Sequence, residues 1–286
     1  MSSVNLLMAE RKPALILERR NSRALVVADL HLGWEATLVK KGINLPSQAP
    51  RMLNRLLALV ERYKPEMLIF LGDIKHTIAW AELEERKVIP SMMDRLLGVV
   101  PRILVIPGNH DGNLEELLPE GVDLLPSSGF SLWGEFGLFH GHAWPSPELL
   151  GCRLLVQGHL HPVVSFRGAW FRITRQVWVK APCQGEALAR AVLRRLGVRV
   201  GDAQPSRLLK ELFNVKLRVE ELIVMPSFND FLGGQPINLE ESGWEDPALM
   251  GPVLRSGAIN VEDADVYLLD GTFLGTVRQL RRFRFS

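Results

Sequence analysis

The chain has 286 residues, 47% of them hydrophobic and 23% charged, and a formal net charge of +2. These proportions are ordinary for a globular protein and exclude a disordered, collagen-like or disulfide-framework chain. No apolar run reaches the roughly 18 residues of a membrane helix, the start lacks the pattern of a signal peptide, and two cysteines fit a reducing compartment. We therefore expect a cytoplasmic protein that has no membrane partner.

The first half of the chain alternates short apolar runs with amphipathic stretches. One helix is predicted from Ser47, its N-terminal cap, to about Val60, and another ends at Leu97 after a restart beyond Pro90. Strands are predicted at residues 24–29, 67–71, 103–106, 138–139 and 154–156. This alternation of strands and helices predicts an α/β protein with a largely parallel sheet.

The second half of the chain is organised differently. Residues 163–179 are predicted to form antiparallel strands, and an Arg-rich helical insertion follows at about 186–219. Residues 220–286 are predicted to be a strand-rich C-terminal extension. Its expected strands are residues 222–224, 266–269 and 283–285.

The insertion itself has helical periodicity. We expect one helix over residues 187–196, ended by Gly197, and a second helix capped by Ser206. The inward face of the first helix should carry the apolar residues that recur every four positions, which are Leu188, Val192 and Leu196.

Polar residues that metals favour directly follow five of the predicted strands. In an open α/β sheet the loops after the strand C-termini line one crevice, so residues far apart in sequence can meet there. The five motifs are Asp29-Leu-His31, Gly72-Asp73, Gly108-Asn-His-Asp111, His140-Gly-His142 and Gly158-His-Leu-His161. One such motif alone is commonly a capped turn, but five in order, each at a strand end, predict a common site.

The residue types in these motifs indicate a metal. Carboxylates, imidazoles and one amide, with no cysteine among them, suit Mn²⁺, Fe or Zn²⁺. In Asp29-x-His31 and in His159-x-His161 the two side chains point the same way from an extended backbone. The ligands are too many for one tetrahedral ion. Two ions about 3.5–4 Å apart would use them all, an arrangement that activates water against a phosphate ester.

The same motifs resemble the calcineurin-like metallophosphoesterase superfamily over about residues 14–181. More narrowly, three stretches resemble the ICC-like, SbcD-related subgroup, which includes PdeM-like nucleases. These stretches are Asp29-Leu-His-Leu-Gly33, Gly72-Asp-Ile-Lys-His76, and Pro226-Ser-Phe-Asn229 with Gly233-Gly234. The resemblance implies a four-layer α/β/β/α sandwich, and hence a single domain over residues 1–286 that consists of the core, the insertion and the extension.

The resemblance also implies how the ligands divide between two metals. The first metal would be held by Asp29, His31 and His161, the second by Asn109, His140 and His159, and Asp73 would bridge the two. The ions are expected to be divalent, most readily Mn²⁺, with Fe, Zn²⁺ and Ni²⁺ as alternatives. A water between them would attack phosphorus in line.

The remaining polar residues receive catalytic or substrate roles by the same resemblance. His110 would protonate or hydrogen-bond the leaving oxygen, oriented by Asp111. His76 matches a histidine that contacts the scissile phosphate in the nuclease relatives. Lys75 adds positive charge near the site, and His142 contacts either a ligand residue or substrate, with simple packing an equal alternative.

Three functions follow as hypotheses. The first is a metal-dependent phosphodiesterase or nuclease that acts on DNA or RNA in repair or processing, with nucleic acid as partner and, by resemblance, a helicase or ligase. The second is a small-molecule phosphoesterase that cleaves nucleotides or cyclic nucleotides. The third is a catalytically silent interaction scaffold, which the complete set of ligand positions disfavours. The oligomeric state is not predicted.

Charge is unevenly distributed along the chain. Residues 153–218 carry 13 basic and 3 acidic side chains, whereas residues 219–270 carry 1 and 11. Arg190, Arg194 and Arg195 fall on the outward side of the predicted insertion helix. They form either a solvated face that pairs with the acidic segment or a track that guides a nucleic-acid strand to the metals through its phosphates.

Overall fold

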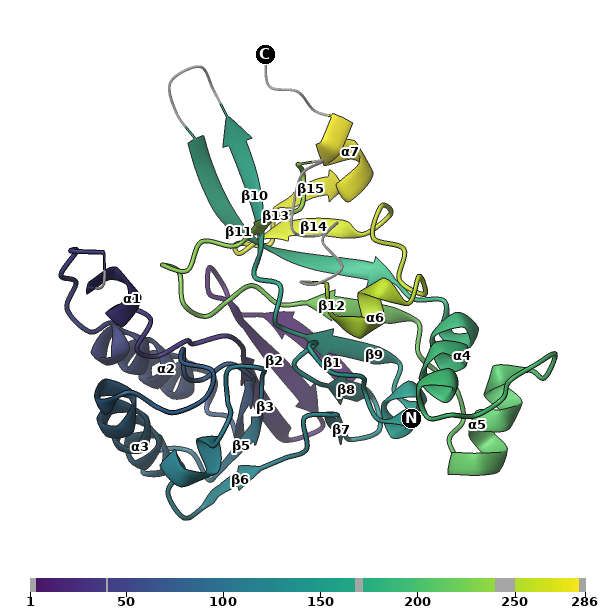
Figure 1. Cartoon of the computed structure of the whole chain (residues 1–286), viewed down its shortest axis with the longest axis horizontal. Coiled ribbons are helices and arrows are strands. Elements are labelled where there is room, and N and C mark those ends of the chain that lie inside the picture. Colours follow the sequence, from purple (N-terminus) through teal and green to yellow (C-terminus); the bar gives the residue numbers. More distant parts are fainter. Residues whose placement is uncertain (1–3, 40, 168–171, 240–249, 283–286) are drawn as a thin grey trace.

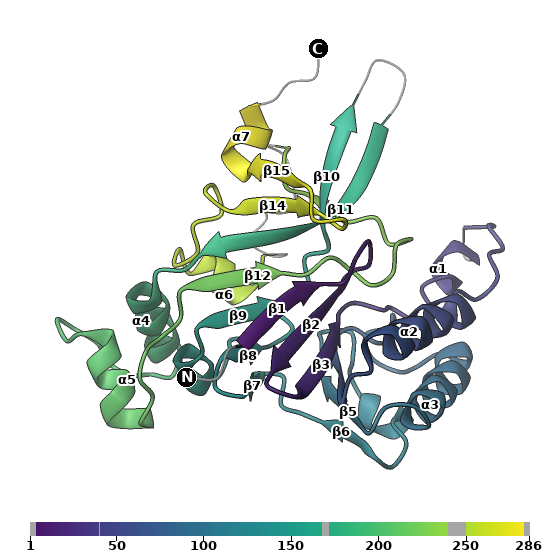
Figure 2. The same ribbon diagram turned by 180° about the vertical axis from the view of Figure 1, so that it is seen from behind.

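The computed structural model describes residues 4–39, 41–167, 172–239 and 250–282. Two β-sheets pack against each other in the centre of the molecule, and helices cover the outer face of each (Figure 1, Figure 2). The predicted four-layer α/β/β/α sandwich is therefore confirmed. In the part of the chain that the structure describes, we find no helix with the length and hydropathy of a membrane span.

The first sheet holds six strands in the order β1-β2-β3-β4-β5-β6. The pairs β1–β2 and β2–β3 are antiparallel and the others are parallel, with Val26 paired to Ile69 and Ile69 to Leu104. The strands are β1 (Val4–Met8), β2 (Ala14–Arg19), β3 (Ser22–Val27), β4 (Met67–Leu71), β5 (Arg102–Ile106) and β6 (Val122–Leu124). The helical segments on this side are α1 (Ala36–Val39), α2 (Ala49–Tyr63), α3 (Leu83–Leu97) and the 3₁₀ helix η1 (Leu114–Leu117).

The second sheet has the order β13-β10-β11-β12-β9-β8-β7, and β14 and β15 extend it from β11. Its parallel pairs are β8–β9, β9–β12 and β10–β13. The strands are β7 (Phe130–Leu132), β8 (Phe136–Leu138), β9 (Leu154–Gln157), β10 (Pro162–Arg167), β11 (Arg172–Pro182), β12 (Glu221–Val224), β13 (Gln235–Pro236), β14 (Asp265–Leu268) and β15 (Phe273–Thr276). The helical segments are η2 (Pro147–Gly151), α4 (Gly185–Arg195), α5 (Pro205–Phe213), α6 (Gly251–Arg255) and α7 (Val277–Arg282).

Alternation of side chains along each strand produces the layers. On β3, Val27 packs under α2 and α3, whereas its neighbour Val26 lies between the two sheets. On β12, Leu222 packs in the core on the side of α4 and α6, whereas Ile223 lies between the sheets. Both faces of the central strands are buried, which is why they are almost purely apolar.

The sheet arrangement corrects one prediction and confirms another. The parallel pairing predicted from the alternation is confirmed for β3–β4, β4–β5 and β8–β9, but these strands belong to two mixed sheets instead of one. The antiparallel strands predicted at 163–179 are confirmed as β10 and β11. The strand predicted at 283–285 lies outside the described residues.

Both predicted helix caps are displaced. Helix α2 starts after Gln48 rather than Ser47, and α5 starts after Gln204 rather than at Ser206. Each helix has a proline in its first turn. The fixed φ of proline suits a helix start, and proline lacks one of the N–H groups that a capping side chain would otherwise satisfy.

Helix α3 runs without interruption through Pro90, where the sequence predicts a restart. A capping box formed by Glu82 and Glu85 begins this helix. Ile89 and Met93 on either side of the proline are buried in the core. Their packing outweighs the local cost of about 3 kcal/mol that proline imposes inside a helix.

Helix α4 matches the predicted insertion helix over most of its length. Gly197 follows it in the left-handed region, with φ +80°, and Leu188 and Val192 are buried as predicted. Leu196 is 51% exposed, so its predicted inward orientation is wrong. It caps the C-terminus of the helix and lies past the last turn that packs on the sheet.

Candidate metal centre

The five motifs meet where loops of the two sheets converge. Asp29 and His31 follow β3, whereas His140 follows β8 in the other sheet. Backbone hydrogen bonds join neighbouring loops, from His31 N to Asp73 O at 2.8 Å and from Gly158 N to His140 O at 3.0 Å. The His159 N–H donates to the Asp29 carboxylate at 3.1 Å, which ties the second sheet directly to the first.

The side chains form two groups with donor atoms close enough to hold an ion. One group is Asp29, His31 and His161, and the other is Asp73, His140 and His159. Asp73 lies between them, because its Oδ2 is 3.4 Å from His31 Nε2 and 3.4 Å from His140 Nε2. A third group, His31, His76 and His110, adjoins the first and shares His31 with it.

The charges in this cluster are buried and coupled. Asp29 and His140 are fully buried, and Asp73 is only 2% exposed. Burial alone would favour neutral imidazole, but the Asp73 and Asp29 carboxylates outweigh it and raise the pKa of His140 to about 10. Burial lowers the pKa of His31 to about 3 despite the Asp73 carboxylate.

The imidazole nitrogens that face the cluster lack hydrogen-bond partners. Nε2 of His31, of His140 and of His161 is buried and has no hydrogen bond in the described part of the chain. Buried polar atoms are normally paired, so several unpaired nitrogens in one place are unusual. His140 Nδ1 donates to the carbonyl oxygen of Leu71 at 2.9 Å, which directs Nε2 towards the cluster. Carboxylate oxygens and unpaired imidazole nitrogens fit divalent transition metals.

The backbone is strained at this site. Five of the predicted ligands have φ between +45° and +74°, a region that side-chain-bearing residues seldom occupy, and these are Asp29, His31, Asp73, His159 and His161. Glycine is required beside them, since a Cβ on Gly72 would collide with the His140 ring and one on Gly108 with the Asp73 carboxylate. The strained backbone conformations thus occur at the residues whose side chains form the cluster.

Two predicted participants lie at the rim of the cluster. Asn109 follows β5 and is exposed, and its role as a ligand stays a prediction. His142 is half-buried, with its ring 5.1 Å from that of His140, and its Nδ1 has no hydrogen-bond partner among the described residues. Burial, assisted by the positive charge of His140, lowers the pKa of His142 to about 4.

The proposed orientation of His110 by Asp111 is wrong. The Asp111 carboxylate accepts the Gly108 N–H at 2.8 Å and the Ile74 N–H at 2.9 Å, so it joins two loops instead of contacting the His110 ring. His110 Nδ1 bonds to the carbonyl oxygen of His76 at 2.5 Å. The His110 ring is therefore oriented by the His76 backbone, and the backbone N–H of His110 donates to Asp73 Oδ1 at 2.9 Å.

Lys75 is held by the backbone of its own loop, and its role as a substrate contact stays a prediction. Its side chain is fully buried, and Nζ donates to the carbonyl oxygens of Thr77, Ile78 and Ala79. Three carbonyl partners satisfy the ammonium group, so Lys75 shapes the loop after the bridging position.

Glu85 is a residue of this site that the sequence analysis missed. It is buried, and its carboxylate accepts the His76 N–H at 3.0 Å, the Thr77 N–H at 2.9 Å and the Glu82 N–H at 2.8 Å. The available signal was its position three residues after Glu82, the spacing of a capping box at a helix start. Its contact with the His76 loop could not be read from that spacing.

The segment Pro226–Gly234 forms a wall of the cluster. Ser227 Oγ donates to the carbonyl oxygen of Asp29 at 2.8 Å, and Asn229 Nδ2 donates to that of Leu30 at 3.0 Å. Gly234 lies so close to the His161 carbonyl that a Cβ would not fit. The sequence analysis used this segment as a family marker without assigning it a position, and its contacts show that it braces the strained loops.

The arginines of the insertion are not brought to the cluster. Arg194 and Arg195 are exposed on α4, and Arg190 Nη1 donates to the Gly201 carbonyl at 3.0 Å. Helices α4 and α5 pack on η2, which leads into the N-terminal end of β9, whereas the cluster follows the C-terminal end of that strand (Figure 1). No ion pair joins these three arginines to the described part of the acidic segment.

Comparison with known proteins gives a family and two structural neighbours. The family model of the calcineurin-like phosphoesterases matches residues 22–171, a range that contains every predicted metal ligand. The chain is similar to the nuclease MPE of Pseudomonas putida, with 20% identity and a TM-score of 0.49 over 93% of this chain and 98% of the other. It is also similar to the phosphoesterase YfcE of E. coli, with 22% identity and a TM-score of 0.31 over 51% of this chain and 74% of the other. No curated protein matches the chain.

Proposed function

The chain belongs to the calcineurin-like phosphoesterase family, and from this premise we propose that it is a dinuclear-metal-dependent phosphodiesterase that cleaves DNA or RNA. The observation that carries the proposal is the position of one carboxylate oxygen. Asp73 Oδ2 lies at equal distance from an imidazole of each of two ligand groups, as expected for a carboxylate that two ions share.

The proposed ligands keep the division expected from the resemblance. Asp29, His31 and His161 would hold one ion, Asn109, His140 and His159 the other, and Asp73 both. The number of imidazoles favours Mn²⁺, Fe, Zn²⁺ or Ni²⁺ over Mg²⁺ and Ca²⁺, which prefer oxygen ligands. When bound, the metal pair would supply Lewis acidity that lowers the pKa of water and neutralises phosphoryl oxygens.

The chain's own residues would position the ester and move one proton. His110 Nδ1 carries the hydrogen that bonds to the His76 carbonyl, so Nε2 would give a proton to the leaving oxygen from the doubly protonated, cationic ring. The His76 ring lies 5.7 Å from the His110 ring and nearly parallel to it, where it would contact the same phosphoryl group. Asp111 would keep the two loops that carry them in register.

Exposed apolar side chains on the loop that follows His76 support a nucleotide-containing substrate. Trp80 is 66% exposed and Ile78 63% exposed, on the loop that begins at His76 and is held by Lys75 and Glu85. An indole ring presented on such a loop offers a surface on which a base can stack. The alternatives of a small-molecule nucleotide phosphoesterase and of a silent scaffold remain to be distinguished. A role in repair, a helicase or ligase partner and a cytoplasmic location stay predictions.

The test is a substrate panel assayed with Mn²⁺ and with EDTA. It consists of labelled DNA and RNA oligonucleotides, cyclic nucleotides, and nitrophenyl diester and monoester substrates. We expect Mn²⁺-dependent cleavage of oligonucleotides and of the diester. A preference for cyclic nucleotides or monoesters would favour the small-molecule alternative, and a protein that binds metal but hydrolyses no ester would be a scaffold.

A further inference from the structure

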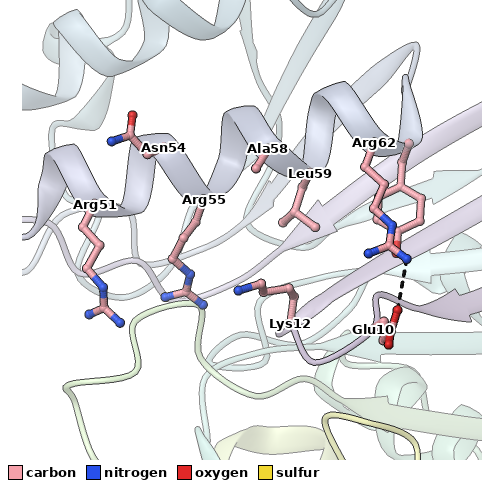
Figure 3. A pocket seen from close by; sticks show the side chains of 9 residues that line it. Glu10, Lys12, Arg51, Asn54, Arg55, Ala58, Leu59 and Arg62 are labelled. Atoms are coloured by element: carbon pink, nitrogen blue, oxygen red, sulfur yellow. Dashed lines mark hydrogen bonds and ion pairs between the residues drawn. The ribbon is translucent and has the colours of Figure 1, made fainter.

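A cavity of about 550 Å³ that no residue of the metal centre lines lies between α2 and the turn that joins β1 to β2. Basic side chains dominate its polar lining: Lys12 from the turn and Arg51, Arg55 and Arg62 from α2. Figure 3 shows these four side chains in a row along the same side of the helix. They line what we call the α2 groove.

The spacing of the arginines explains this arrangement. Arg51, Arg55 and Arg62 differ by four and seven positions, which places them on one face of a helix. Eleven residues of helix rise about 16 Å. This length is enough for several consecutive phosphates of one nucleic-acid strand to lie along the groove.

The groove has an excess of positive charge. Asp230 pairs with Arg51 at 2.7 Å and with Arg55 at 3.2 Å, and Glu10 pairs with Arg62 at 3.1 Å. Two carboxylates therefore face four cations. Lys12 has no ion pair among the described residues. Arg62 and Glu10 are each about 60% exposed, so their pair is weak and open to competition by phosphate.

The groove adjoins the wall of the metal centre. Arg55 Nη1 donates to the carbonyl oxygen of Phe228 at 3.1 Å, and its guanidinium lies 4.5 Å from the centroid of the Phe228 ring. The Phe228 N–H in turn donates to the Ala28 carbonyl at 2.7 Å, directly before the ligand Asp29. One residue of the Pro226–Gly234 wall thus contacts both the groove and the backbone of the cluster.

We propose that the α2 groove binds the phosphate backbone of a nucleic-acid strand whose neighbouring ester lies at the metal centre. This inference rests on the proposed function and replaces the α4 arginines as the phosphate track. A line of cations along a helix suits a chain of phosphates better than a single phosphate, which would need converging donors.

The experiment measures binding by metal-free, full-length protein in EDTA, with a fluorescent single-stranded oligonucleotide of about a dozen nucleotides. The double variant Lys12→Glu/Arg62→Glu should bind at least about tenfold more weakly at low salt. Its plot of log K against log salt should lose about 1.4 units of slope, at 0.7 per contact. Glu10→Gln should bind about two- to fivefold more tightly, because it frees Arg62 from an exposed ion pair.

The matched control is Arg194→Glu/Arg195→Glu, which makes the same change of charge at two exposed positions on α4. We expect a much smaller loss of affinity in this variant. Equal losses in both double variants, or no loss in the groove variant, would overturn the proposal. Thermal unfolding of each variant checks folding, and Lys12→Gln/Arg62→Gln provides a milder change should the charge reversal unfold the protein.

Two further measurements separate the remaining outcomes. Displacement of the oligonucleotide by a mononucleotide or by inorganic phosphate, at concentrations similar to that of the oligonucleotide, would assign the groove to a free nucleotide and overturn the strand proposal. If the parent protein hydrolyses a nitrophenyl diester but the groove variants bind the oligonucleotide normally, the groove proposal is refuted and the proposed function is retained. If binding depends on the groove but the parent protein hydrolyses no ester, the groove proposal is retained and the proposed function is refuted.

Discussion

Asp73 has the least replaceable side chain of the cluster, because one of its oxygens approaches both ligand groups. Asp73→Asn should abolish hydrolysis and reduce the bound metal, since an amide is a poor substitute for a bridging carboxylate. The fold should remain, because the backbone of this loop is held by its own hydrogen bonds to neighbouring loops. Metal content, kcat and circular dichroism measure the three effects. Near-normal turnover with full metal content would contradict the dinuclear site.

His110 tests the chemistry separately from metal binding. If His110 gives the proton to the leaving oxygen, His110→Ala should leave the metal content unchanged and reduce kcat by about 10²–10⁴-fold. The loss should be smaller for nitrophenyl esters, whose leaving group needs no proton. The comparison of leaving groups on one variant is its own control. Equal losses on good and poor leaving groups, or loss of metal, would argue for a ligand or structural role.

At the residue scale, sequence reasoning located the site better than it assigned side-chain contacts. Asp29, Asp73 and His140 could be placed because a polar residue directly after a buried strand must lie at the sheet edge. Asp111 was misassigned because its side-chain direction depends on loops whose backbone the sequence pattern does not specify. The sequence also did not show that the ammonium group of Lys75 bonds to carbonyl oxygens of its own loop.

Among the elements, the loop from His76 to Glu82 connects the fold most directly to the proposed chemistry. Glu85→Gln should lower kcat about ten- to hundredfold, because the amide cannot accept all the N–H groups that now hold His76 and Thr77. It should also destabilise the fold by about 1–3 kcal/mol, the cost of buried unpaired donors. Metal content should not change, since Glu85 contacts no ligand.

Glu84→Gln is the matched control for that measurement. Glu84 lies in the same first turn of α3 and is exposed, so it should change neither kcat nor stability appreciably. A Glu85 variant that loses stability but keeps its kcat would show that the loop has no role in positioning His76. Equal effects at both positions would point to the charge of the helix terminus instead.

The elements also show what periodicity can and cannot predict. Apolar runs located the central strands because both faces of these strands are buried, whichever neighbours they have. They could not indicate that β12 inserts between β9 and β11, since this pairing joins residues more than 60 positions apart. The helix starts were missed by one or two residues because proline, and not the nearby serine, determines where α2 and α5 begin.

At the scale of the whole molecule, the cluster connects the two sheets. Its ligand positions after β3 and β4 belong to the first sheet, and those after β8 and β9 belong to the second. The residue pattern alone predicted one crevice on one sheet, and the resemblance supplied the two-sheet arrangement. An ion bound at this junction would therefore hold the two halves of the sandwich together.

This arrangement predicts that metal stabilises the whole fold. An ion that binds only the folded state at a hundredfold excess over its Kd adds about 2.7 kcal/mol, and each kcal/mol raises the Tm by about 2–4 °C in a domain of roughly this size. Adding Mn²⁺ to EDTA-treated protein should thus raise the Tm by about 5–10 °C. Mg²⁺ at the same concentration should raise it less, because imidazoles form much of the cluster. The shift should disappear in Asp73→Asn, and an equal shift in that variant would mean that the metal acts elsewhere.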